Sequence, residues 1–150
     1  MSVSEIHVAA PPERVFDVLR DRTLYGEWVV GTASTTPDEG EWPEPGSALR
    51  YTVAGPIPLS DRTVVLAADE PRRLELHTRA GHLPDGRIVL EVRPEGSGSR
   101  VRMEERPAHL LFHLLAGPVG HWVLARRNDI ALHRLRRLTE AGAGAEVGSV

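Results

Sequence analysis

Short segments in which apolar and polar residues alternate fill most of the chain, and a long helical pattern follows them. The first segment, residues 2–10, predicts a strand that ends at Pro11 and Pro12, and proline is well tolerated at a helix start. Apolar residues within 13–19 then recur at helical spacing, which predicts a short amphipathic helix. A second helical turn is expected over residues 23–28.

The middle of the chain predicts six further strands, because alternation of apolar and polar residues between turn signals is typical of half-buried strands. They are expected over residues 29–36, 49–53, 62–68, 73–80, 87–93 and 100–106. The expected core faces of the last three, in order, carry Leu74/Leu76, Ile88/Leu90/Val92 and Val101/Met103. In the last strand the same alternation also places Glu105 on the inner side.

After Pro107 a short apolar helix is expected over residues 109–116, broken by Gly117 and Pro118. A longer helix then covers about residues 119–139. Its apolar positions form one stripe on a helical wheel: Val119, Val123, Leu124, Ile130, Ala131, Leu135 and Leu138. Arg127 falls near the middle of this stripe and Asn128 at its edge.

This order of elements indicates a curved antiparallel sheet of about six to seven strands wrapped around the long helix. We expect a single domain over residues 1–140, followed by a small, glycine-rich and flexible tail over residues 141–150. A sheet that grips a helix usually leaves a cavity between them. Binding of a small molecule is therefore the leading hypothesis.

Composition removes several classes of chemistry. The chain has no cysteine, and all 18 of its basic residues are arginine, which excludes thiolate metal sites, thiol nucleophiles and lysine Schiff bases. Aromatic residues make up only 5%, too few for a base-stacking surface, so no nucleic-acid partner is expected. Residues 1–10 lack the features of a signal peptide, and histidines and glycines interrupt residues 108–125. We expect a cytoplasmic protein without an integral membrane segment.

Two charged side chains, Glu105 and Arg127, are directed toward the interior by this patterning. A buried charge without a partner is too costly to keep, so each needs a partner or access to water. They form either a polar anchor or acid in a ligand pocket, or a structural ion pair, and the sequence leaves both interpretations open.

Two histidines, His109 and His113, are four apart on an expected helix and could in principle face one metal ion. The residues between them are Leu-Leu-Phe and include no general base, so ordinary histidines on a helix face are the favoured interpretation. No metal, nucleotide or other cofactor is expected. His113 stays, with Glu105, a candidate general acid/base.

The chain resembles the polyketide cyclase/dehydrase-like branch of the START-related (SRPBCC) superfamily. The resemblance rests on residues 10–19 with Asp21, Tyr25 and Trp28, on segments 42–47 and 55–63, and on residues 126–128 with Leu132 and Leu135. It implies an α+β helix-grip (START/Bet v 1-like) fold with a cavity for a lipid, an aromatic polyketide or a similar apolar molecule.

Three functions follow from this resemblance and the residues together. The first is binding of a small hydrophobic ligand by Tyr25, Trp28, Tyr51, Leu66, Leu76, Leu90, Met103, Glu105, Trp122 and Arg127. The second is a cyclase or dehydratase that uses Glu105 or His113 as general acid/base. The third is lipid transfer at a membrane surface, with segment 109–116 as a gate. Whether a reaction is catalysed, the identity of the ligand and a homodimeric state all stay open.

Overall fold

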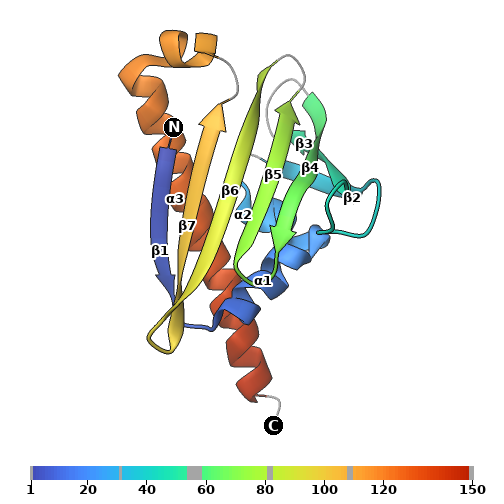
Figure 1. Ribbon diagram of the computed structural model, residues 1–150, viewed down its shortest axis with the longest axis vertical. Coiled ribbons are helices and arrows are strands. Elements are labelled where there is room, and N and C mark those ends of the chain that lie inside the picture. The colour runs from blue at the N-terminus through green and yellow to red at the C-terminus, as the bar shows by residue number, and fades with distance from the viewer. Residues whose placement is uncertain (1, 31, 54–58, 81–82, 108–109, 149–150) are drawn as a thin grey trace.

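The computed structural model describes residues 2–30, 32–53, 59–80, 83–107 and 110–148. Within these residues, seven strands, two short helices, one 3-10 turn and one long kinked helix are found in the expected order (Figure 1). They are β1 (Ser2–Val8), α1 (Pro12–Arg20), η1 (Arg22–Leu24), α2 (Tyr25–Trp28), β2 (Thr32–Pro37), β3 (Ala48–Val53), β4 (Leu59–Asp69), β5 (Arg73–Ala80), β6 (Leu83–Glu95), β7 (Gly98–Pro107) and α3 (Leu110–Gly148).

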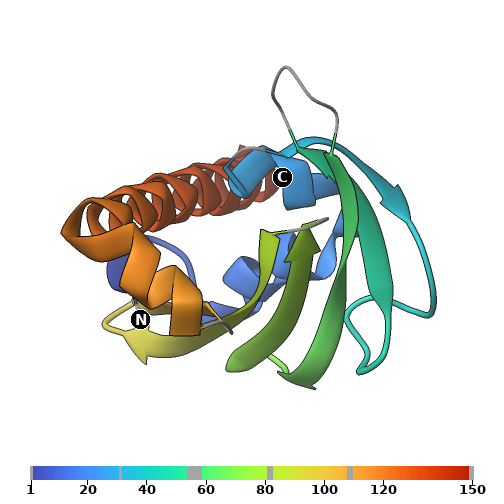
Figure 2. The same cartoon turned by 90° about the horizontal axis from the view of Figure 1, so that it is seen from above.

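All seven strands form one antiparallel sheet in the order β1-β7-β6-β5-β4-β3-β2. The first strand therefore pairs with the last, which brings β1 and β7 together beside α3. Figure 2 shows the sheet curving around the side on which the helices lie. The predicted fold, a curved antiparallel sheet around a long helix with short helices after the first strand, is confirmed.

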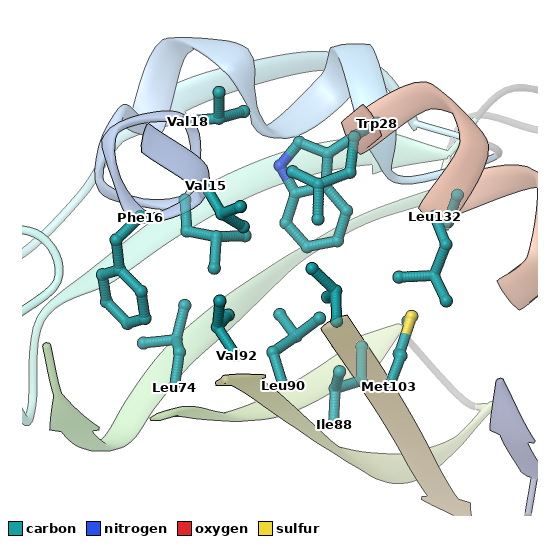
Figure 3. Packing of buried hydrophobic residues seen from close by; sticks show 14 of the residues in the cluster. Val15, Phe16, Val18, Trp28, Leu74, Ile88, Leu90, Val92, Met103 and Leu132 are labelled. Atoms are coloured by element: carbon teal, nitrogen blue, oxygen red, sulfur yellow. The ribbon is translucent and has the colours of Figure 1, made fainter. Parts of the chain in front are cut away.

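The core lies between the inner face of this sheet and the helices (Figure 3). The inner-face residues predicted from alternation are all buried: Leu74, Leu76, Ile88, Leu90, Val92, Val101 and Met103. Val15 and Phe16 of α1, Trp28 of α2 and Leu132 of α3 belong to the same buried cluster. The core is therefore shared between strands and all three helices.

The turn between α1 and α2 is fixed by local hydrogen bonds that position the site. Asp21 follows α1, and its carboxylate accepts from the Thr23 N–H at 3.0 Å, which caps η1. Trp42, from the loop before β3, donates its Nε1–H to the Leu19 carbonyl at 3.0 Å. These contacts hold Tyr25 and Trp28 against the sheet.

The apolar stripe predicted for the long helix is confirmed in its later turns, where Ala131 and Leu135 are buried and Leu138 packs against the core, but it is wrong in its first turns and at Ile130. Val119, Val123 and Ile130 are 73%, 53% and 36% exposed. The buried face adds Asn128, Leu132 and Thr139 to the predicted Ala131 and Leu135. The physical reason is that the first turns after the kink at Gly117 leave their apolar residues facing outward, whereas the later turns pack on β1 and α1.

The expected break between a short and a long helix falls at Gly117, whose φ of 54° interrupts α3. The helix then continues to Gly148, beyond the expected end near residue 139. Most of the segment 141–150 that composition assigned to a tail is therefore helical. Its alternating alanines are strong helix formers, which offsets the cost of the glycines between them. Among the described residues, no helix is both long and apolar enough to cross a membrane.

Candidate functional site

An ion pair between Glu105 and Arg127 joins the last strand, β7, to the last helix, α3. Glu105 follows Val101 and Met103 on the inner face of β7 and is 8% exposed. Its Oε1 lies 3.8 Å from Nη1 of Arg127 on α3, and Arg127 also donates its Nε–H to the Val30 carbonyl at 3.3 Å. The two charges that the sequence directed inward are thus brought together, but only Glu105 is buried: the Arg127 side chain is 44% exposed, which corrects its predicted interior position.

Burial raises the pKa of the Glu105 carboxyl above its ordinary value. The positive charge of Arg127 and the amide of Asn128 lower the pKa, but by less than burial raises it. Glu105 therefore holds a proton at higher pH than an exposed glutamate does. A carboxyl of this kind can serve as a hydrogen-bond donor or a proton donor in an apolar surrounding.

Asn128 lies next to Arg127 on α3 and is 1% exposed. The Asn128 amide lies close enough to Glu105 to lower the pKa of its carboxyl. Its Nδ2 nevertheless has no partner among the described residues at the distance and angle of a hydrogen bond. Sequence reasoning placed Asn128 only at the edge of the helical stripe and did not select it. The sequence did contain a signal for this residue. Asn128 lies three and four residues before Ala131 and Leu132, so it shares their side of the helix, and a polar amide among buried apolar residues is uncommon.

An aromatic cluster forms the neighbouring part of the interior, with Tyr25 and Trp28 buried and Trp42 and Tyr51 partly buried against them. The Tyr25 ring centroid lies 5.6 Å from that of Trp28, 6.4 Å from Trp42 and 6.2 Å from Tyr51. The Tyr25 and Thr63 hydroxyls are hydrogen-bonded at 3.0 Å. Burial raises the pKa of Tyr25 to about 12, so its hydroxyl stays neutral near pH 7. Trp42, which the sequence analysis did not select, belongs to this cluster.

The remaining predicted pocket residues fall in different places. Leu76, Leu90 and Met103 are buried on the inner face of the sheet. Leu66 is 45% exposed, because it is the extra residue of a β-bulge between Val65 and Ala67. Trp122 is 65% exposed on the first turns after the kink. The structure does not bring these last two residues into the core.

The predicted histidine candidates fall outside what the structure describes. His109 lies outside the described residues, and the side chains of His113 and His121 are not among those the structure describes. The group brought together at the site therefore consists of Glu105, Arg127, Asn128 and the aromatic cluster. Chemically it offers one buried carboxyl, a buried amide beside it and a neutral phenol next to an apolar interior. This combination suits a ligand that is mostly apolar with a polar end.

Solved structures with the same fold cover nearly the whole chain. Protein CV1439 from Chromobacterium violaceum is 18% identical, with 93% of this chain and 99% of that chain covered at a TM-score of 0.71. TTHA0849 from Thermus thermophilus is 19% identical, with coverage of 94% and 97% and a TM-score of 0.69. Ara h 8.0201 is 12% identical, with coverage of 93% and 96% and a TM-score of 0.70. At these identities the likeness establishes the fold alone.

A comparison with curated proteins gives no significant match. The family described as "Polyketide cyclase / dehydrase and lipid transport" matches residues 2–140 of the chain. This range runs from the first strand through the ion pair and the buried face of α3, and it confirms the resemblance drawn from the sequence. The chain belongs to the polyketide cyclase/dehydrase and lipid transport family.

Proposed function

We propose that this protein binds a small, largely apolar molecule between the inner face of the sheet and α3, with the polar end of the molecule at Asn128, Glu105 and Arg127. The observation that carries this proposal is the Asn128 Nδ2 group, which is buried and makes no hydrogen bond with the described residues. A buried donor without a partner costs about 1–3 kcal/mol. A ligand oxygen that accepts from Nδ2 would remove that cost.

The apolar part of the ligand supplies most of the affinity in this proposal. Leu90, Met103 and Trp28 provide the apolar surroundings, and burial of apolar ligand surface contributes roughly 25 cal/mol per Å². Because Arg127 already faces Glu105, it is not a free anchor for an anionic ligand. We therefore expect a neutral polar end, such as a carbonyl or hydroxyl group, to bind better than a carboxylate.

The test combines native mass spectrometry of freshly purified protein with calorimetric titration of 2-naphthol and 2-naphthoate. We expect a co-purified apolar molecule, and tighter binding of the neutral probe. Asn128→Leu removes the amide donor and should weaken naphthol binding about tenfold. Arg137→Gln, at an exposed position of the same helix, is the matched control. The proposal fails if no molecule co-purifies and neither probe binds saturably, or if Asn128→Leu binds naphthol like the control.

A cyclase or dehydratase reaction is the second candidate function, and the raised pKa of Glu105 favours it. A carboxyl tuned in this way can protonate or deprotonate a bound carbonyl compound. If it does, turnover of a poly-β-ketone substrate should follow a bell-shaped pH profile that disappears in Glu105→Gln. Unchanged turnover in that variant would reject Glu105 as the acid/base.

Lipid transfer at a membrane surface is the third candidate function. It is supported by the exposed apolar side chains of Val119, Trp122 and Val123 on α3, with exposed Arg126 one turn further along. Exposed apolar residues beside a cation suit an anionic bilayer surface. Co-sedimentation with phosphatidylglycerol vesicles should then fall in Trp122→Ser and at high salt. Sedimentation independent of both would count against this function.

A further inference from the structure

A concave feature lies on the outer face of the sheet, opposite the helices. It is a groove of about 410 Å³ whose lining includes five arginines, Arg72, Arg73, Arg93, Arg100 and Arg102. This volume is within the range of small-molecule sites. The groove shares no charged residue with the interior site, because Glu105 and Arg127 lie on the other side of the sheet.

The groove arises where neighbouring strands differ in length. The last residue pair between β5 and β6 is Arg73 with Glu91, whereas β6 and β7 continue as a hairpin to Glu95 and Gly98. The turn between β4 and β5 lies beside this longer hairpin, at the lower end of the sheet in Figure 1. The N–H of Val92 donates to the Arg72 carbonyl at 2.8 Å, which fixes the turn against β6.

Four of the five arginines already have acidic partners. Arg100 is held by Glu95 through hydrogen bonds of 2.6 and 2.9 Å, and Arg102 by Glu104 at 2.9 Å. Arg73 contacts Glu75 at 3.3 Å. Arg72 pairs with Asp69 at 3.0 Å, but both side chains are well exposed, and an exposed pair of this kind contributes little.

Arg93 is different, because it makes no hydrogen bond or ion pair with any residue in the described part of the chain. It also lies directly opposite Arg100 in the β6–β7 ladder. Like charges in directly opposed positions destabilise a sheet. Because Glu95 already compensates the charge of Arg100, Arg93 is the guanidinium that a bound anion would meet without a competing carboxylate partner.

We propose that this groove binds a phosphate group carrying two negative charges, held between Arg93 of β6 and Arg72 of the β4–β5 turn. Guanidinium groups match phosphate geometry and bind it through paired, charge-assisted hydrogen bonds. Two side chains from separate elements can contact different oxygens of the same group. Such a phosphate can belong to a free small molecule or to a lipid headgroup, and the experiment separates these sources.

Glu91 gives the proposal a test with an opposite sign. Its carboxylate lines the groove between Arg73 and Arg102 in the strand register, 4.0 Å from Nη1 of Arg102. It lowers the positive potential that a bound phosphate would feel. Its removal should therefore improve binding, whereas a residue that only supports the fold would weaken binding when it is replaced.

The experiment titrates inorganic pyrophosphate into the protein, with calorimetry and amide chemical shifts as the two readouts. We expect saturable binding with shifts confined to residues 69–73 and 91–102. Arg93→Gln should weaken the affinity about tenfold, as expected for loss of one direct charged contact. Glu91→Gln should tighten it by roughly threefold. Arg137→Gln on α3 removes the same charge far from the groove and should have no effect.

A parallel arm uses phosphatidic acid vesicles, with phosphatidylcholine vesicles as the reference. Sedimentation with phosphatidic acid that depends on Arg93 assigns the site to a lipid headgroup, and pyrophosphate binding without it assigns the site to a free phosphate compound. The proposal is overturned if neither arm distinguishes Arg93→Gln from Arg137→Gln. It is also overturned if Glu91→Gln weakens binding or if the shifts spread over the arginines of α3.

Discussion

Glu105 on β7 and Arg127 on α3 form an ion pair whose two side chains are unequally exposed. The carboxylate side chain is 11% exposed, whereas the guanidinium side chain is 44% exposed. Arg127 can therefore be solvated without its partner, but Glu105 cannot. Because burial dominates its pKa, the negative charge of Glu105 is costly to the folded state even with Arg127 beside it.

The first prediction concerns Glu105→Gln and pH. A carboxyl whose pKa is raised on folding binds its proton more tightly in the folded state, so its contribution to stability is complete below the unfolded pKa and is lost as pH rises through the folded pKa. Glutamine removes this loss. The variant should therefore gain stability relative to the wild type at pH 7.5, and the gain should shrink at pH 4. Thermal unfolding at both values measures it, and a larger gain at pH 4 would refute the assignment.

The second prediction uses the adjacent residue, Glu104, which faces the outer side of the sheet. Hydrogen bonds from Arg102 and Arg106 lower the pKa of the Glu104 carboxyl. Its contribution to stability is therefore present above the unfolded pKa and is lost as pH falls through the folded pKa. Glu104→Gln should destabilise the protein at pH 7.5 and lose this effect in acid, the reverse of Glu105→Gln. Parallel pH profiles for the two variants would contradict the opposite facing of these residues.

The third prediction concerns the hydrogen bond between Tyr25 and Thr63. Tyr25→Phe leaves the Thr63 hydroxyl, which is 0% exposed, without its partner. The expected loss is about 1–3 kcal/mol in the free energy of unfolding. In the double variant with Thr63→Val both polar groups are absent, so part of the loss should be recovered. Urea denaturation of the four proteins measures this, and strictly additive losses would show that the hydroxyls are not coupled.

Much of this fold could be predicted because several strands show, in their own sequence, which of their residues face the core. Leu74 and Leu76, or Val101 and Met103, alternate with charged residues, and a half-buried sheet requires that pattern. The same reasoning placed Glu105 inside and left its pairing with Arg127 as one of two open interpretations. Local sequence was sufficient here because successive side chains of a strand point to opposite faces, so alternation alone assigns each residue to one of two faces.

The helix α3 shows where such reasoning stops. Its apolar residues occur on more than one side of the helix, so the wheel alone could not decide which of them are buried. Leu132 was left out of the predicted stripe, whereas Val119 and Val123 were included and are exposed. The choice depends on how the kink at Gly117 rotates the helix against β1, which is a tertiary effect. For the same reason Asn128 was missed as a buried group.

The fourth prediction tests this revised helix face. Leu132 is 1% exposed, and Leu132→Ala should cost about 2–5 kcal/mol because it leaves a cavity in the core. Val123 is 53% exposed, and Val123→Ala should change stability by less than about 0.5 kcal/mol. Urea denaturation compares them. Equal losses in the two variants would restore the face predicted from the sequence.

The fifth prediction concerns Gly98, the first residue of β7. A Cβ at this position would lie 2.3 Å from the Val8 carbonyl oxygen at the end of β1, so the backbone of one strand would have to move. Gly98→Ala should therefore destabilise the protein by about 1–3 kcal/mol.

Gly142 on α3 is the matched control for Gly98, because a Cβ there meets nothing within 4 Å. Gly142→Ala should stabilise the protein by about 0.5–1 kcal/mol, since alanine loses less backbone entropy in a helix. Urea denaturation of both variants separates steric overlap from helix propensity. Since β1 is an edge strand whose neighbour in the sheet is β7, amide exchange of residues 2–8 should accelerate in Gly98→Ala and stay unchanged in Gly142→Ala. Unaltered exchange in both variants would mean that β1 tolerates the added methyl group without moving.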